Sequence, residues 1–167
     1  MKQMRGLRFA AIAAFSLLLV MVVLVGYLFL TAEVQVIDID VQGISAASDP
    51  IAFETLKQSI EQGTFYGTLY QKPIEWRDAS EYVYLNYTLR IRNNCLVPID
   101  MIEVQVVPQA GDILQTADLQ VKSLDLKSEG DLSVQILAPK DTHSIREMIV
   151  TYYLWGVSGS VKTVYGQ

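Results

Sequence analysis

The chain has little of the residues that most catalytic and metal sites need. It contains one histidine, His143, and one cysteine, Cys95. A lone cysteine excludes an internal disulfide, so stability must come from the hydrophobic core, and we expect Cys95 to be a small buried residue rather than a nucleophile. Without His and Cys clusters, a transition-metal site lacks its usual ligands, and the Gly-rich phosphate-binding motifs are missing as well. We therefore predict no metal, no cofactor and no catalytic residue.

His143 is the one residue that invites a catalytic reading. It lies in the stretch Lys140–Ser144, which also holds an acid and two hydroxyls. Adjacent side chains of this kind do not converge on one reacting atom, because a catalytic triad is assembled across space. We interpret the stretch as a turn before a strand. Acids at Asp38, Asp40 and in 125–131 lack EF-hand spacing, so we interpret them as strand and turn residues.

Positive charge is scarce beyond the first residues. Three of the 13 Lys and Arg residues lie at the start of the chain, and the other ten are outnumbered by the 18 Asp and Glu residues after Leu30, a net charge of −8 there. Neutralising nucleic-acid phosphates requires a basic face. The acidic balance therefore predicts no nucleic-acid partner.

The chain does have one long apolar run, Phe9–Leu30, which contains no charged residue. A helix of this length crosses a hydrocarbon core of about 30 Å and satisfies its own backbone. Lys2, Arg5 and Arg8 precede the run, and no basic residue follows until Lys57, so the positive-inside rule places the N-terminus in the cytoplasm. We predict a cytoplasmic basic N-terminus (1–8), an uncleaved transmembrane signal anchor in the cell membrane (9–30) and an extracytoplasmic domain (33–167).

Two alternatives to an anchor remain open. A cleaved signal peptide would have a shorter apolar region and a small-residue cleavage site, whereas Leu30-Thr31-Ala32 places a bulky residue two positions before Ala. Arg5-Gly6-Leu7 is similar to the leader-peptidase site of type IV pilins. Those proteins carry Glu five residues past the cut, where this chain has Ala11. Both differences favour the anchor.

Most of the region after the run has the pattern of β-strands. Residues 82–92 alternate between apolar positions (83, 85, 87, 89 and 91) and more polar ones. Such alternation is typical of an antiparallel sheet with one buried and one solvated face. Residues 149–155 are apolar on both faces, which predicts a central strand. The strands we expect are Glu33–Val41, Tyr82–Arg92, Ile99–Val107, Leu119–Leu126, Leu132–Leu137, Arg146–Trp155 and Ser160–Tyr165.

Turns and one helix complete the predicted fold. Asn93-Asn94 breaks the strand pattern, and Pro108–Asp112, Glu129-Gly130 and Val157–Gly159 are typical of turns. Asp49 and Pro50 suit the start of a helix, and Phe53, Leu56 and Ile60 follow at helical spacing before Gly63. We expect an amphipathic helix over 49–62 that covers an edge or open end of a sheet. With seven or eight short strands, these elements predict a mainly β, antiparallel, immunoglobulin-like sandwich with one short helix.

Residues 80–139 resemble the water-stress and hypersensitive-response (WHy) domain of late-embryogenesis-abundant-like proteins. A strand is followed by Asn93-Asn94, then Pro98-Ile99, a second strand, and Gly111 with Leu114. In that family a Pro stands between the two Asn residues, which this chain lacks. The resemblance implies an immunoglobulin-like sandwich without catalytic residues, and a stress-protective function without a defined ligand.

Aromatic residues supply the candidate partner-binding surface. Tyr has a large contact area at low rotamer cost, so a tyrosine-rich face suits protein binding. Ordinary cross-strand pairing is the alternative. Trp76, which stands between acids, either stacks on a ligand or pins its loop to the core. The candidate surface consists of Tyr66, Tyr70, Trp76, Tyr82 and Tyr84.

These observations predict a single-pass, non-catalytic binding or scaffolding protein that is accessory to an envelope or surface assembly, with an unknown protein partner. The alternative is an anchored hydrolase that acts on envelope polymers through Glu75 or Asp78, because paired carboxylates are separated in space rather than in sequence.

Overall fold

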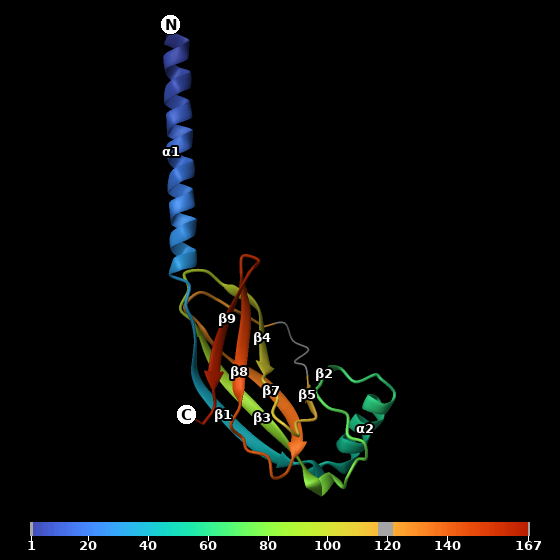
Figure 1. The fold of residues 1–167 in the computed structure, drawn as a ribbon. Coiled ribbons are helices and arrows are strands. Elements are labelled where there is room, and N and C mark those ends of the chain that lie inside the picture. Colours follow the sequence, from blue (N-terminus) through green and yellow to red (C-terminus); the bar gives the residue numbers. More distant parts are fainter. Residues whose placement is uncertain (1, 117–121, 167) are drawn as a thin grey trace.

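The computed structural model describes residues 2–116 and 122–166. It is mainly β, with 44% strand and 26% helix, and consists of two antiparallel sheets and two α-helices (Figure 1). This confirms the sandwich-like, antiparallel organisation that the alternating pattern predicts.

Helix α1, Lys2–Leu30, projects away from the sheets along their long direction (Figure 1). Its segment Ala10–Leu30 is long and apolar enough to cross a membrane, and the most apolar part of that segment buries nothing within the protein. The last turn is different, because Phe29 packs against the core between the sheets. The apolar helix is confirmed, whereas its insertion and orientation stay predictions.

The two sheets face each other and enclose the main core. The first has the order β1-β3-β7-β5-β2, with bounds Val34–Ser45, Tyr82–Asn93, Glu129–Pro139, Leu114–Thr116 and Gly67–Leu69. The second has the order β6-β4-β8-β9, with bounds Lys122–Leu124, Ile99–Val106, Glu147–Leu154 and Val157–Val164. Strand β8 lies between β4 and β9, which confirms its predicted central place.

Strand β3 shows how the alternating pattern builds the core. Leu85, Tyr87, Leu89 and Ile91 are buried between the sheets, as predicted. The opposite face is solvated beyond Tyr84 and carries cross-strand ion pairs between Arg90 and Asp131 and between Arg92 and Glu129. Cys95 is buried and free at the end of this strand, as expected.

Three details of the predicted strands and turns are wrong. The short strands β2 and β5 were not expected. Glu129-Gly130 begins β7 rather than a turn, and Val157–Gly159 begins β9. The turns fall earlier, where Lys127 and Trp155 adopt positive φ of 54° and 50°, a conformation that the residue type does not predict. Of the predicted strand 119–126, residues 119–121 lie outside the described residues, and β6 covers Lys122–Leu124.

Helix α2, Pro50–Glu61, forms as predicted. The Asp49 side chain accepts the Ala52 N–H at 2.9 Å, Pro50 stands in the first turn, and Gly63 has a φ of 69° after the helix end. Phe53 and Ile60 are buried in a second, smaller core beneath the helix. The helix therefore covers one end of the first sheet.

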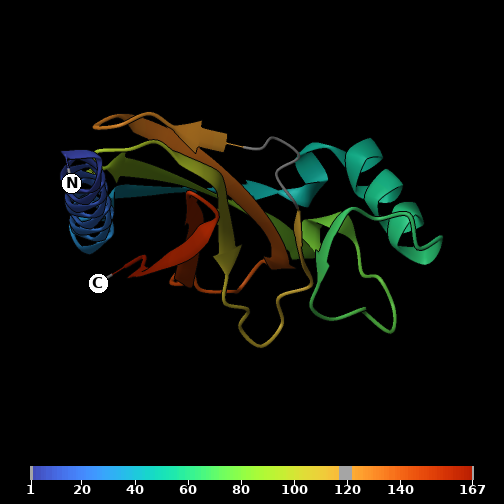
Figure 2. The same cartoon turned by 90° about the horizontal axis from the view of Figure 1, so that it is seen from above.

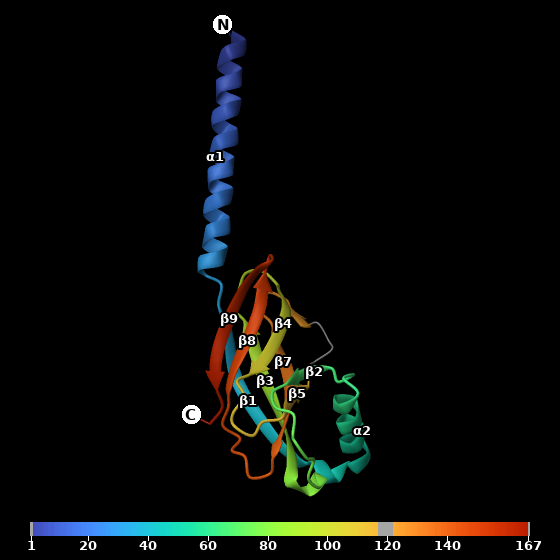
Figure 3. The same ribbon diagram turned by 45° about the vertical axis from the view of Figure 1, so that its right-hand side comes forward.

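The two helices lie at opposite ends of the sandwich, as Figures 1, 2 and 3 show from three directions. We call these ends the α1 end and the α2 end. The α2 end comprises α2, the 3-10 helices η1 (Ala46–Ser48) and η2 (Ala79–Glu81), and the loop 62–78 that surrounds β2.

Candidate functional site

A pocket of about 230 Å³ opens at the α2 end. The segment before β3 supplies its charged rim, and the turns beside β5 and β7 supply its floor. Glu75, Arg77 and Glu81 are exposed, so their charges meet solvent as well as any occupant. The pocket is lined by Gln71, Pro73, Glu75, Arg77, Glu81, Tyr82, Gly111, Ile113 and Pro139.

An aromatic cluster holds this pocket in place. The Trp76 ring makes edge contacts with Phe53 of α2 and Tyr82 of β3, at centroid distances of 5.8 and 5.9 Å. The Tyr82 hydroxyl accepts the Arg77 N–H at 3.2 Å. Trp76 thus pins its loop to the core, as the second of its two readings expected. The solvent-facing position expected for Tyr82 is wrong, because α2 and Trp76 cover that end of β3.

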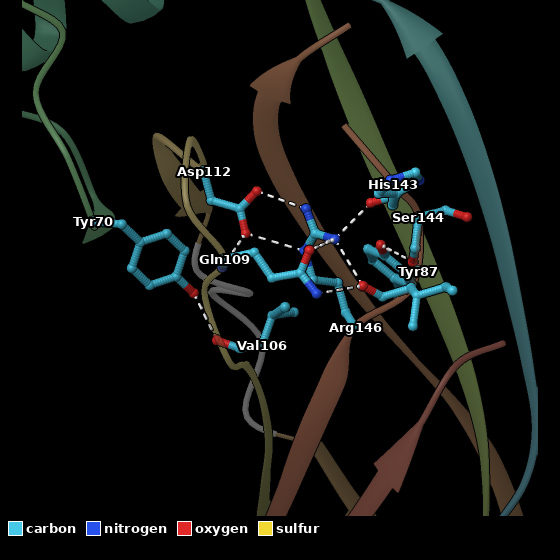
Figure 4. Close-up of polar contacts among 9 residues, drawn as sticks. Tyr70, Tyr87, Val106, Gln109, Asp112, His143, Ser144 and Arg146 are labelled. Carbon is cyan, nitrogen blue, oxygen red and sulfur yellow. Dashed lines mark hydrogen bonds and ion pairs between the residues drawn. The ribbon is translucent and has the colours of Figure 1, made fainter. Parts of the chain in front are cut away.

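Of the other predicted surface residues, only Tyr84 packs against the smaller core that contains Tyr82. Tyr66 is exposed beside β2, whereas Tyr84 is half-buried and burial raises the pKa of its hydroxyl. Tyr70 points into the protein, where its hydroxyl lies 2.9 Å from the Val106 carbonyl oxygen (Figure 4). The same hydroxyl lies 2.7 Å from Gln115 Oε1. Its single proton is donated to one of these oxygens. The structure therefore brings Trp76, Tyr82 and the half-buried Tyr84 to one small core, of which Tyr66 and Tyr70 are not part.

The carboxylates predicted for hydrolysis also separate. Glu75 lines the pocket, whereas Asp78 precedes η2 and is not part of the lining. Glu81, which was not singled out from the sequence, joins Glu75 there. Among the described residues, no group of three or more His, Cys, Asp or Glu side chains could hold a metal ion.

The most ordered polar cluster was not anticipated from the sequence. Arg146 and Asp112 are both fully buried and form a two-point ion pair, with Nε to Oδ2 at 3.1 Å and Nη2 to Oδ1 at 2.7 Å (Figure 4). Arg146 Nη1 also donates to Gln109 Oε1 and to the carbonyl of His143. All three nitrogens of the guanidinium therefore donate to protein acceptors. The cluster has the chemistry of a structural clamp.

This Arg146 clamp joins two loops that are distant in sequence. Asp112 Oδ2 accepts the Gln109 N–H at 2.8 Å, which closes the loop before β5. Tyr87, at the centre of β3, donates to the Ser144 carbonyl at 2.6 Å and fixes the loop before β8. His143 itself is exposed in that loop, as the turn interpretation predicts. A hint was present in the sequence, since Arg146 directly precedes β8, which is mostly apolar from Met148 onward.

Asn93 forms a second buried clamp, at the α1 end. Its Nδ2 lies 3.0, 3.2 and 2.9 Å from the carbonyl oxygens of Val97, Leu124 and Asp125. Its Oδ1 accepts the Cys95 N–H at 2.9 Å. Asn93 thereby ties the turn after β3 to the turn after β6.

No protein-family model matches the chain, and no curated protein matches its sequence. The resemblance to the WHy domain therefore stays a prediction. In this chain Asn93 acts structurally, by joining two turns.

Two tyrosines predict how stability responds to alkaline pH. Burial raises the pKa of Tyr70 to about 12, and the charge of Asp112 adds to the shift. Burial also raises the pKa of Tyr87 to about 12, although Arg146 opposes the shift. An unfolded tyrosine ionises near pH 10. Between these values the unfolded chain loses protons that the folded chain keeps.

We therefore expect stability that is fully present below about pH 10 to fall as the pH rises toward 12. Urea unfolding in a mild detergent at several pH values in this range measures the fall. Tyr87→Phe removes one of the two groups and should make the dependence shallower, whereas Tyr66→Phe, at an exposed tyrosine, should leave it unchanged. Equal pH dependence in all three proteins would contradict this.

Proposed function

We propose that this chain is a single-pass membrane protein whose extracytoplasmic, immunoglobulin-like sandwich is a non-catalytic binding or scaffolding module. The observation that carries the proposal is α1. Apart from its last turn, the apolar span leaves its side chains unburied, and an aqueous environment would expose them. A lipid bilayer removes the free-energy cost of exposing these apolar side chains to water. The basic N-terminal flank orients the helix with the sandwich outside the cytoplasm.

The α2 end supports a binding role. Ile74 is fully exposed, and Ile51 and Tyr66 are 80% and 68% exposed. Exposed apolar side chains on several elements of one end favour a protein interface, where such groups supply contact area. The charged rim of the neighbouring pocket would add polar contacts around them. We therefore place the partner protein at the α2 end, opposite the anchor.

Photocrosslinking in the membranes of cells that express the chain tests this placement. A benzophenone side chain introduced at position 66 should give one discrete product with a partner protein. Ile74→Asp should abolish the product, because a charge replaces an apolar contact. Thr88→Asp, a matched change on the exposed face of β3, should leave it unaffected. A product that is insensitive to Ile74→Asp, or no discrete product, would contradict the proposal.

The pocket favours a second candidate, an anchored hydrolase of envelope polymers. Glu75 and Glu81 line one cavity, and acid–base hydrolysis of a glycosidic bond uses two carboxylates of one site. Turnover by the detergent-solubilised chain should then be lost in Glu75→Gln and Glu81→Gln. It should persist in Asp78→Asn, since Asp78 is not part of the lining. Absence of turnover in the unmodified chain would exclude this candidate.

A further inference from the structure

Three turns of the sandwich meet at the α1 end. Strand β1 begins opposite the last residue of β3, and β7 begins opposite Arg92 near the same point. Strand β4 begins opposite the last residues of β8. The loop 94–98, the turn 125–128 and the hairpin turn 155–156 therefore all lie beside the junction with α1.

Each of these turns exposes a large apolar side chain. Leu96 is 49% exposed and Leu126 is 53% exposed, and the other three residues of the turn 125–128 are polar. Trp155 and Val157 are each 55% exposed at the tip of the β8–β9 hairpin. We call these four residues the loop-tip surface. Their common place beside α1 points to one environment that covers all of them.

The depth of Trp155 relative to α1 identifies that environment. The Trp155 ring lies edge-on to Phe29, with centroids 5.9 Å apart. Phe29 is inside the apolar span Ala10–Leu30. The hairpin tip reaches the level of the last turn of α1 in Figures 1 and 3. A ring at this level lies at the boundary between headgroups and acyl chains, where tryptophan is favoured.

The backbone conformation of the hairpin turn is a second observation that concerns Trp155. Trp155 has a φ of 50° and Gly156 a φ of 81°. A two-residue hairpin turn of this kind usually has Asn or Gly in its first position, and a bulky residue there is a conformational outlier. Such strain persists where a functional contact favours the residue. The turn conformation therefore does not favour a tryptophan at position 155. The contacts of its ring are the better explanation for this residue.

We propose that the loop-tip surface is a membrane-contact site that lies on the outer leaflet of the bilayer crossed by α1. The inference rests on the anchoring proposed above. Its ligand is the lipid interface, and its effect is to fix the tilt of the sandwich so that the α2 end is held away from the membrane. A short connection from Leu30 to Val34 and the packing of Phe29 against the core keep the surface at this height.

The chain contains two tryptophans, which allow a direct test. The full chain is reconstituted in phosphatidylcholine vesicles with and without acyl chains brominated near the headgroup, and flotation establishes its association with the vesicles. Trp76→Phe leaves Trp155 as the reporter, and Trp155→Phe leaves Trp76 at the α2 end. The emission of Trp155 should fall about twofold on bromination, because its ring lies in the interface, whereas that of Trp76 should not change.

A second pair of reporters extends the test to another turn. In a background with both tryptophans replaced by Phe, Leu126→Trp should be quenched and Ile74→Trp, at an exposed aliphatic of the α2 end, should not. A protein that floats with vesicles but shows no quenching of Trp155 or of the reporter at 126 overturns this inference alone. Equal quenching at both ends also overturns it. A protein that does not float overturns the proposed anchoring itself.

Discussion

Asp112→Ala should lower the free energy of unfolding by about 3–5 kcal/mol, because it leaves the Arg146 guanidinium buried without its counter-charge. Both side chains are fully buried, so water cannot replace the lost partner. The loops before β5 and β8 would also lose the contact that joins them. Urea unfolding of the chain in a mild detergent, followed by near-UV circular dichroism, measures the loss.

A double-mutant cycle separates the ion pair from ordinary packing. Arg146→Met alone should also be strongly destabilising, because it leaves the Asp112 carboxylate buried without a counter-charge. The double variant, with Asp112→Ala and Arg146→Met, should cost clearly less than the two single changes together, since no buried charge is left. Asp131→Ala breaks the exposed pair with Arg90 and should barely move the unfolding midpoint. Additive single effects would contradict the role assigned to the clamp.

Asn93→Ala should lower the free energy of unfolding by about 3 kcal/mol, the loss expected when a buried amide leaves its partners unsatisfied. Asn93 is fully buried and serves carbonyl groups on two turns as well as the Cys95 N–H. Removing the amide leaves these groups in a site that excludes water. The measurement is the same unfolding experiment.

The adjacent residue supplies the matched control. Asn94 is half-buried, so Asn94→Ala should cost much less than the same change at 93. Asn93→Asp retains an acceptor for Cys95 but replaces the donor with a charge beside carbonyl oxygens, and should be at least as damaging as Asn93→Ala. Similar costs at positions 93 and 94 would show that the amide network does not carry the stability.

Sequence patterns correctly predicted the helices and strands that are specified by neighbouring residues. The apolar run produced α1, Asp49 and Pro50 marked the start of α2, and the alternation over 82–92 produced β3. Two short strands and one turn were missed, for different reasons. Strands β2 and β5 are three residues each and exist through their pairing with each other and with β7. The turn at Trp155 escaped prediction because its conformation disagrees with its residue type.

The candidate site was predictable only in part. Trp76 as a loop anchor and Glu75 as a potential ligand-facing acid both followed from one short stretch of sequence. The burial of Tyr82 required knowledge of where α2 docks. The Arg146 clamp pairs residues 34 positions apart, a separation at which residue spacing carries no information about contact.

The central claim is that α1 crosses the membrane and holds the sandwich outside the cytoplasm. A membrane-impermeant maleimide reagent tests it in intact cells that express single-cysteine reporters. Cys95 is buried and should give little background. Glu61→Cys, at the exposed end of α2, should be labelled in intact cells, and Gln3→Cys only after permeabilisation. Labelling of the reporter at position 61 only after permeabilisation, or of the reporter at position 3 in intact cells, would contradict the account.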